Sequence, residues 1–170
     1  MRNRLLSLVL GVSAVAAAAG LAACGGSSPK GDVNTAFNKA LKATILVNSR
    51  GRTLYVFDVD TDNMPTCYDD ATYHCSKGWP PLLVHGAVKA GKGVDASRLT
   101  TVKRTDGTVQ VSYNQHPLYT FAGFAPGGNA PAAPGDAKPG DLNGQGYIDY
   151  WWVLSPAGKR IKTTPSGSGY

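Results

Sequence analysis

The feature of this sequence that most constrains its fold is a short aromatic motif that occurs twice. Residues 53–57 read Thr-Leu-Tyr-Val-Phe and residues 117–121 read Pro-Leu-Tyr-Thr-Phe, so both have the form x-Leu-Tyr-x-Phe, and each follows a turn. Aromatic and β-branched residues favour a pleated, half-buried strand. Two hairpin units that carry this motif and pack face to face would form one small domain with a shared core.

The rest of the chain has the short strand patterns separated by turn residues that are typical of a β protein. Strand-turn-strand patterns cover residues 44–58, 99–121 and 150–161, and Asp106-Gly107 between alternating strands is a strong hairpin signal. All eleven acidic residues are Asp, which favours turns over helices. A short N-terminal helix remains allowed, with Asp32 as its cap and Val33, Phe37 and Leu41 on one face. We therefore predict a mostly β fold, a small antiparallel sheet or sandwich built from two repeated hairpin units.

The N-terminus has the profile of an export signal. Arg2 and Arg4 precede an apolar and small-residue run that ends in Leu21-Ala22-Ala23-Cys24, and this tetrapeptide resembles the bacterial lipobox. The resemblance implies cleavage before Cys24 and attachment of lipid to it, whereas an uncleaved transmembrane helix of about 20 residues is the alternative. We predict a lipoprotein anchored to the cell membrane, with its folded part on the extracytoplasmic face.

These patterns divide the chain into four parts. Residues 1–23 are the predicted signal peptide, and residues 24–42 hold the lipidated cysteine and a flexible tether. The β domain is predicted over residues 43–162 and includes a long Gly/Pro-rich loop at 125–146. Residues 163–170 are predicted to be a disordered tail.

The charge of the mature chain is mildly basic. Without Arg2 and Arg4 the seventeen Lys and Arg residues become fifteen, against eleven Asp, which gives a net charge of +4. The basic residues form no run and no nucleic-acid motif, so we expect no nucleic-acid partner. Binding to anionic lipid or to a cell-wall polymer stays open.

The two cysteines that remain after lipidation are Cys67 and Cys75. An even number of cysteines outside the cytosol favours one disulfide. A metal or redox site is the alternative because His74 adjoins Cys75, but a single Cys-x₇-Cys spacing matches no zinc pattern and no Cys-x-x-Cys is present.

Catalytic and metal-binding motifs have little support. The three histidines lie in turn-like or Pro-rich contexts, with no recognisable nucleophile and base. The spacing of Asp58, Asp60, Asp62 and Asp69 partly matches a calcium-binding EF-hand loop, but the central Gly and the final Glu are missing. A solvated acidic loop is the favoured interpretation and calcium the alternative; we predict no cofactor otherwise.

Several ordered motifs resemble a known family. Tyr55-Val56-Phe57-Asp58-Val59-Asp60 fits a Tyr-x-(Phe/Trp/Tyr)-x-x-Asp motif, and the two cysteines precede Trp79-Pro80-Pro81-Leu82. Asp106-Gly107 then leads to Tyr119 and Phe121, and residues 140–146 and 152–158 also fit. The chain thus resembles the bacterial secreted-repeat lipoproteins. It departs from them in a wider cysteine spacing and in Phe124, which stands where the second repeat would place Asp. The family has no established activity, so the resemblance implies export without naming a ligand.

The aromatic residues after the long loop are the candidate ligand platform. Neighbouring strand residues point to opposite faces, so we expect one of Trp151 and Trp152 to fill the core and the other either to line a groove or to be covered by the loop. The candidate ligand-binding residues are Tyr147, Tyr150, Trp151, Trp152, Asp141, Asn143 and Gln145. We predict a non-catalytic module that binds an envelope glycan or protein, with a calcium-binding or redox-linked lipoprotein as the alternative.

Overall fold

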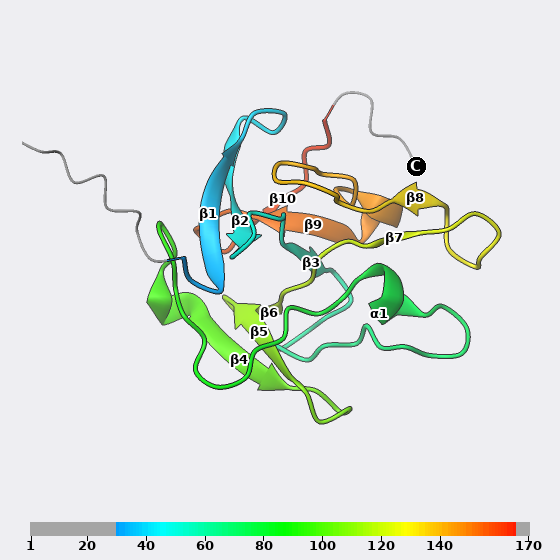
Figure 1. Cartoon of the computed structure of the whole chain (residues 1–170), viewed down its shortest axis with the longest axis horizontal. Coiled ribbons are helices and arrows are strands. Elements are labelled where there is room, and N and C mark those ends of the chain that lie inside the picture. The colour runs from blue at the N-terminus through cyan, green and yellow to red at the C-terminus, as the bar shows by residue number, and fades with distance from the viewer. Residues whose placement is uncertain (1–29, 166–170) are drawn as a thin grey trace, which may run out of the picture.

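The computed structural model describes residues 30–165, and these form a mostly β domain of several small antiparallel sheets (Figure 1). The strands are β1 (Val33–Asn38), β2 (Ala43–Asn48), β3 (Tyr55–Phe57), β4 (Leu99–Lys103), β5 (Val109–Tyr113), β6 (His116–Pro117), β7 (Gly123–Phe124), β8 (Ala133–Pro134), β9 (Trp151–Leu154) and β10 (Arg160–Ile161). The short helices are α1 (Cys75–Gly78), η1 (Ala96–Arg98) and η2 (Tyr147–Asp149).

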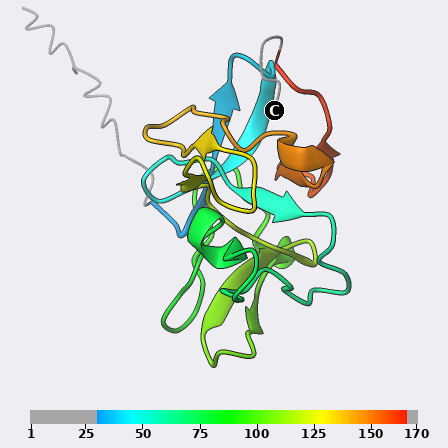
Figure 2. The ribbon, with the colours of Figure 1, turned by 90° about the vertical axis from the view of Figure 1, so that its right-hand side faces the viewer.

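Four sheets are defined by the strand pairing, in the orders β1-β2, β10-β9-β3, β4-β5-β6 and β7-β8. The view turned by 90° shows the β1–β2 hairpin at one end and the β4–β5 hairpin at the other, with β3 between them (Figure 2). Tyr55 and Tyr119 join the two ends, because the amide of each donates to the carbonyl of the other at 2.9 Å. The two copies of the aromatic motif therefore pair directly with each other.

The duplication extends beyond the motif into the hairpin before it. In the first copy the amide of Leu54 donates to the carbonyl of Leu46 on β2, and in the second the amide of Leu118 donates to that of Val111 on β5. Both β2 and β5 are the second strands of antiparallel hairpins. The predicted repeated hairpin units are thus present, each made of a hairpin, a turn and the x-Leu-Tyr-x-Phe strand.

Each motif strand also pairs with a Trp-containing segment from the other half of the chain. Phe57 on β3 lies opposite Trp151 on β9. The second motif runs antiparallel to the segment after Trp79, since Tyr119 bridges Pro81 and the amide of Thr120 donates to the carbonyl of Pro80. Trp79 and Trp151 consequently hold equivalent places, and the two units exchange their last strands.

The short helix allowed at residues 32–42 is wrong. Residues 33–38 form β1, which pairs with β2 from Val33 opposite Asn48 to Asn38 opposite Ala43. The turn between the strands is fixed by Asn38, whose side-chain oxygen accepts the amides of Ala40 and Leu41. Burial of Val33 and pairing with β2 outweigh the weak helical pattern. The β structure therefore begins within the range assigned to the tether.

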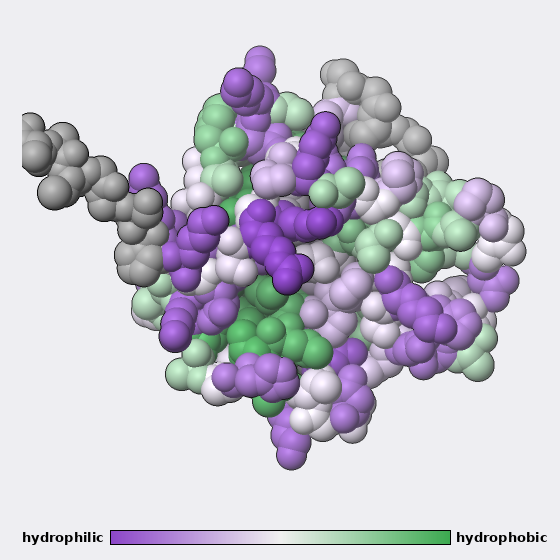
Figure 3. All heavy atoms as spheres, viewed as in Figure 1, coloured by the Kyte–Doolittle hydropathy of each residue, from purple (hydrophilic) through white to green (hydrophobic). Residues whose placement is uncertain are grey.

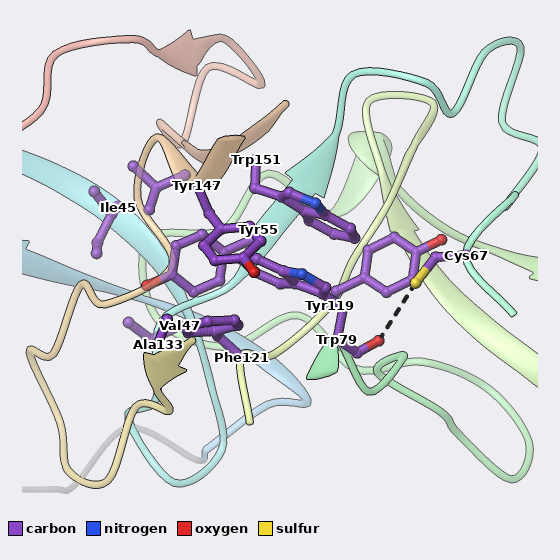
Figure 4. Close-up of a cluster of buried hydrophobic side chains, with 11 residues drawn as sticks. Ile45, Val47, Tyr55, Cys67, Trp79, Tyr119, Phe121, Ala133, Tyr147 and Trp151 are labelled. Carbon is purple, nitrogen blue, oxygen red and sulfur yellow. Dashed lines mark hydrogen bonds between the residues drawn. The ribbon is translucent and has the colours of Figure 1, made fainter. Parts of the chain in front are cut away.

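Two apolar clusters lie on opposite faces of the central strands. One contains Tyr55, Trp79, Tyr119, Phe121 and Trp151 (Figure 4), and the other contains residues such as Leu54, Val56 and Trp152. Trp151 and Trp152 do point to opposite faces, as strand alternation requires. Both are nevertheless buried, because both faces are covered.

The long Gly/Pro-rich segment is more ordered than a plain loop. It contains β8, which pairs with β7, and it ends at Gln145, which is 1% exposed. The Gln145 side chain donates to the carbonyls of Ile161 and Thr163 and accepts the amide of Val153. It thereby joins the end of the loop to β9 and to the start of the predicted tail. Within residues 30–165, no helix is long and apolar enough to cross a membrane; the signal peptide and Cys24 lie outside the described residues.

Candidate functional site, an aromatic groove

A stack of four aromatic rings occupies the centre of the domain. Trp79 and Trp151 are parallel, with ring centroids 3.8 Å apart and planes inclined by 1° (Figure 4). Phe57 stacks on Trp151 at 4.3 Å, and Phe121 lies against Trp79 at 4.1 Å. The order Phe57, Trp151, Trp79, Phe121 follows from the duplication, since each Phe contacts the Trp on the strand it pairs with.

Two buried tyrosine-carboxylate pairs support this stack. The hydroxyl of Tyr119 donates to Asp60 at 2.7 Å, and that of Tyr55 donates to Asp136 at 2.8 Å. The amide of Asp60 donates to the carbonyl of Phe57, and the amide of Asp136 donates in the same way to Phe121. Asp136 is therefore the second repeat's counterpart of Asp60.

This assignment explains the departure at Phe124. Asp60 follows Phe57 by three residues, whereas Asp136 follows Phe121 by fifteen. The additional residues contain the β7–β8 hairpin. The second repeat thus keeps its aspartate but has a hairpin inserted before it, and Phe124 belongs to the insertion.

Burial sets the protonation of these groups. It raises the pKa of Asp136 to about 6, although hydrogen bonds from Tyr55 and from the Asn143 amide act in the opposite direction. It also raises the pKa of Asp60, against the lowering effect of Thr66 and Tyr119. The pKa of Tyr119 is raised by burial and by the neighbouring Asp60 charge, so the hydroxyl remains a hydrogen-bond donor at every physiological pH.

The predicted disulfide between Cys67 and Cys75 is confirmed, with the two Cα atoms 5.3 Å apart. The Cys67 sulfur lies 4.0 Å from the carbonyl oxygen of Trp79, which is a packing contact because a disulfide sulfur has no proton to donate (Figure 4). Arg104 donates to the Cys67 carbonyl at 2.7 Å and lies over the ring of Tyr68 at 4.1 Å. The disulfide and Arg104 together hold the 68–74 segment against the ring stack.

A cavity of about 300 Å³ opens beside the stack. Its apolar walls come from both repeats and from the inserted hairpin, and Thr66 and Asp70 are the non-aromatic polar residues among its lining. We call this cavity the aromatic groove, after its six aromatic residues Phe57, Tyr73, Trp79, Phe124, Tyr147 and Trp151.

The rim of the groove carries exposed apolar side chains. Tyr73 is 61% exposed and Ile148 is 44% exposed. Ile148 also has φ 47° and ψ 27°, a left-handed conformation that a β-branched residue rarely adopts. An isoleucine is thus held half-exposed at a backbone position that would favour Gly or Asn.

The structure separates the predicted ligand-binding residues. Tyr147 and Trp151 line the groove, and Tyr150 is 49% exposed beside it, with its ring 6.3 Å from Phe57. Trp152 lies on the opposite face, where its indole donates to Asp58 and Lys162 lies over its ring.

The polar members of the predicted set lie elsewhere and stabilise the loop. The Asp141 carboxylate accepts the amides of Ala137 and Lys138, and the Asn143 side chain donates to Gly135. With Gln145 buried, none of these three lines the groove. The structure therefore does not bring the second Trp and these polar residues together in one groove, because the polar side chains bond within the loop and to neighbouring strands.

The predicted ligand-binding set contains only two of the lining residues, Tyr147 and Trp151, and it omits the apolar side chains of Tyr73, Phe124 and Ile148. Tyr73 lies in the disulfide-closed segment, and Ile148 lies in the irregular η2 turn. Phe124 was noticed only as a departure from the repeat. Their turn-forming neighbours indicate that these apolar side chains are exposed. The same pattern does not predict the backbone conformation of Ile148, nor that the three side chains meet in one groove.

The four carboxylates that suggested calcium do not converge. Asp58 pairs with Arg160 and Lys162, and Asp69 pairs with His74 at 2.6 Å. Asp60 is buried against Tyr119, whereas Asp62 is exposed. Among residues 30–165, no group of three or more His, Cys, Asp or Glu side chains is placed to hold a metal ion.

The fold and the groove define a duplicated, disulfide-linked β domain with an apolar cavity of binding-site size. Residues 100–129, from β4 to the loop after β7, match the family model described as a secreted repeat of unknown function. This match confirms the resemblance and is consistent with an exported protein outside the cytoplasm. No curated protein and no solved structure shows significant similarity to the chain.

Proposed function

We propose that this protein is an exported lipoprotein, anchored through Cys24, and that it is a non-catalytic binding module with the aromatic groove as its ligand site. The observation that carries the proposal is Ile148. A β-branched side chain in the left-handed region costs of order 1–3 kcal/mol and persists where the surrounding structure imposes it. Here the strained backbone conformation of Ile148 holds its apolar side chain half-exposed at the rim of a cavity.

The lining indicates the chemistry of the ligand. A cavity of about 300 Å³ is at the small end of ligand sites. Besides the hydroxyls of Tyr73 and Tyr147, of which the second already donates to Pro131, only Thr66 and Asp70 among the described lining residues are polar, so most hydroxyls of a sugar would lose water there without gaining a partner. We therefore assign the groove to an apolar, ring-sized group, such as a side chain presented by a protein of the cell envelope.

Asp70 gives the groove a preference for the charge of its ligand. Hydrogen bonds from the amides of Tyr73 and Thr72 lower its pKa, so the carboxylate is ionised at neutral pH. An anionic group at this rim disfavours acidic ligands. The preferred ligand is apolar, with neutral or cationic groups beside its ring.

A neutral fluorescent probe tests the groove. Titration of the protein with N-phenyl-1-naphthylamine should give saturable, one-to-one binding. Ala130→Trp places an indole in the groove, because Ala130 lines it, and should abolish binding. Ala157→Trp is the matched control, since Ala157 is exposed and lies outside the groove lining.

Ile148→Gly separates binding from stability. Glycine adopts the left-handed conformation without strain, but it loses more conformational entropy on folding. Because the relief of strain is the larger of the two effects, the free energy of unfolding should rise by up to about 1 kcal/mol. The variant should also bind the probe several-fold more weakly, because the apolar rim is lost. Unchanged probe affinity in both Ala130→Trp and Ile148→Gly would show that the groove is not the binding site.

A further inference from the structure

Five cationic side chains gather around β1 and the segments that adjoin it. Lys30, Arg50 and Lys92 border one surface cavity of about 520 Å³, and Arg50 and Arg52 border the next. Lys89 belongs to the same surface because the 89–92 segment pairs with β1, with a bridge between Val33 and Ala90. We call these five residues, Lys30, Arg50, Arg52, Lys89 and Lys92, the basic face.

The basic face keeps its charge available. The ion pairs found among residues 30–165 include none of the five cations. Two carboxylates are near: Asp32 accepts the amide of Lys89, and Asp136 is buried, with its carbonyl accepting from Arg52. Four of the five cations are exposed, and Arg52 is half-buried.

The charge of the domain is distributed unevenly. Residues 58–70 contain five Asp and no Lys or Arg. Two of these, Asp69 and Asp70, lie near Tyr73 and α1 beside the aromatic groove, and Asp69 pairs there with Lys77. In Figure 3 hydrophilic side chains gather around the lower part of β1, where the chain enters the domain, whereas paler and apolar residues lie over its upper part. In Figure 1, β1 lies on the left of the domain and α1 and β7 lie on the right, so the part of the basic face at β1 and the aromatic groove are on different sides of the domain.

The basic face also lies where the chain enters the domain. Lys30 is the first described residue and belongs to this face, and only six peptide units join it to Cys24. A chain of that length spans at most about 20 Å when fully extended. A lipid on Cys24 would thus hold the basic face within a short distance of the headgroups.

We propose that the basic face docks onto anionic phospholipid headgroups of the leaflet that holds the Cys24 lipid, which fixes the domain on the membrane with the aromatic groove facing away. The inference rests on the proposed lipid anchor for its location and on the basic face for its orientation. Each Lys or Arg near an anionic surface strengthens association by about fivefold, and salt screens this attraction within about 10 Å at 0.1 M.

The test uses the lipidated full-length mature protein in two kinds of vesicle, pure phosphatidylcholine and phosphatidylcholine with 30% phosphatidylglycerol. A membrane-impermeant amine-acetylating reagent is applied, and the labelling of each lysine is quantified by peptide mass spectrometry. Lys30, Lys89 and Lys92 should be labelled at least threefold less in the anionic vesicles than in the neutral ones. Lys103 and Lys159, which are exposed and lie outside the basic face, should be labelled equally in both.

Matched charge reversals identify which surface is responsible for the protection of the lysines in anionic vesicles. Lys89→Glu/Lys92→Glu should restore the labelling of Lys30 in anionic vesicles, whereas Lys103→Glu/Lys159→Glu, with the same change in net charge, should not. Raising the salt to 0.5 M should also restore labelling. Flotation with neutral vesicles reports the lipid anchor separately, since it needs no charge.

Two outcomes would overturn the docking. Equal labelling of Lys89 and Lys92 in both vesicles would show that the face does not touch the headgroups. Equal protection of the same lysines in both kinds of vesicle, relative to Lys103 and Lys159, would show that the protection does not require anionic headgroups. Failure of flotation with preserved, salt-sensitive protection in anionic vesicles would reject the anchor and keep the docking.

Discussion

The hydroxyl of Tyr119 donates to the buried carboxylate of Asp60 at 2.7 Å, and these two residues belong to different repeats. The same relationship holds in reverse between Tyr55 and Asp136. Each repeat therefore supplies the acceptor for the tyrosine of the other, and the two halves stabilise each other through polar contacts as well as through the ring stack.

Tyr119→Phe should lower the free energy of unfolding by about 1–3 kcal/mol, because it leaves the buried Asp60 without one of its donors. Tyr113→Phe is the control, since the Tyr113 hydroxyl bonds only neutral backbone groups: it donates to the carbonyl of Pro156 and accepts the amide of Asp95 at 3.3 Å. Its loss should be about 1 kcal/mol. Urea denaturation measures both, and a smaller loss for Tyr119→Phe than for Tyr113→Phe would contradict the importance of the cross-repeat pair.

The stability contributed by Asp136 should decrease as the pH rises from 4 to 7. Its pKa in the folded state is raised to about 6, above the unfolded value of 3.8, so the folded state binds the proton more tightly. The contribution is fully present below the unfolded pKa and is lost as the pH passes the folded pKa, with a total of about 3 kcal/mol at 1.4 kcal/mol per unit. Asp60, whose pKa is also raised, acts in the same direction.

The measurement is the difference in unfolding free energy between wild type and Asp136→Asn at a series of pH values. This difference isolates Asp136 from His116, whose pKa is lowered by burial and by Arg160 and which therefore acts in the opposite direction. The asparagine variant should gain relative to wild type between pH 4 and pH 7. A difference that stays constant over this range would show that Asp136 titrates normally.

Substitution of the stacked tryptophans should be non-additive. Trp79→Phe and Trp151→Phe affect rings whose centroids are 3.8 Å apart, so the double variant should deviate from the sum of the singles by about 0.5–3 kcal/mol. Trp79→Phe combined with Trp152→Phe is the matched pair, because Trp152 belongs to the other cluster. That pair should be additive within about 0.5 kcal/mol. Coupling of equal size in both pairs would mean that the clusters are not separate.

Loss of the disulfide should destabilise the domain by about 2.5 kcal/mol, as expected from closure of a loop of this size. Cys67 and Cys75 are eight positions apart. Thermal unfolding of Cys67→Ser/Cys75→Ser against wild type measures the effect. Thiol titration of the denatured, non-reduced wild type should find neither cysteine reactive, and one free thiol on each would refute the bond.

Cys24→Ala should abolish lipid labelling and retention by the membrane, because the signal would no longer provide an acylation site. Incorporation of labelled palmitate and fractionation of the cells measure the two effects. Retention of an uncleaved Cys24→Ala chain would indicate instead that the N-terminal segment acts as a transmembrane helix.

The sequence predicts local features of this fold better than the contacts between its halves. The hairpins and the disulfide follow from turn residues and cysteine count, which are local. At residues 33–38 the helical spacing of Val33 and Phe37 was misleading, since pairing with β2 decided the structure. Phe37, expected on the buried face of a helix, is 64% exposed.

The site was harder to predict because its residues meet only in the folded domain. Alternation correctly placed Trp151 and Trp152 on opposite faces, but it cannot show that a second cluster covers the other face. The partner of Tyr55 was hidden for another reason, because the β7–β8 insertion moved the second aspartate to Asp136. A repeat motif read at fixed spacing cannot find a residue displaced by an insertion.

The exchange of last strands between the repeats determines when this chain can finish folding during synthesis. β3 pairs with β9, so its partner emerges from the ribosome almost a hundred residues later. The first repeat cannot complete its sheet alone, and contacts of such long separation slow folding. The nascent chain therefore stays without its complete tertiary structure until Trp151–Leu154 has been made, and the proposed export would act on a chain that has not finished folding.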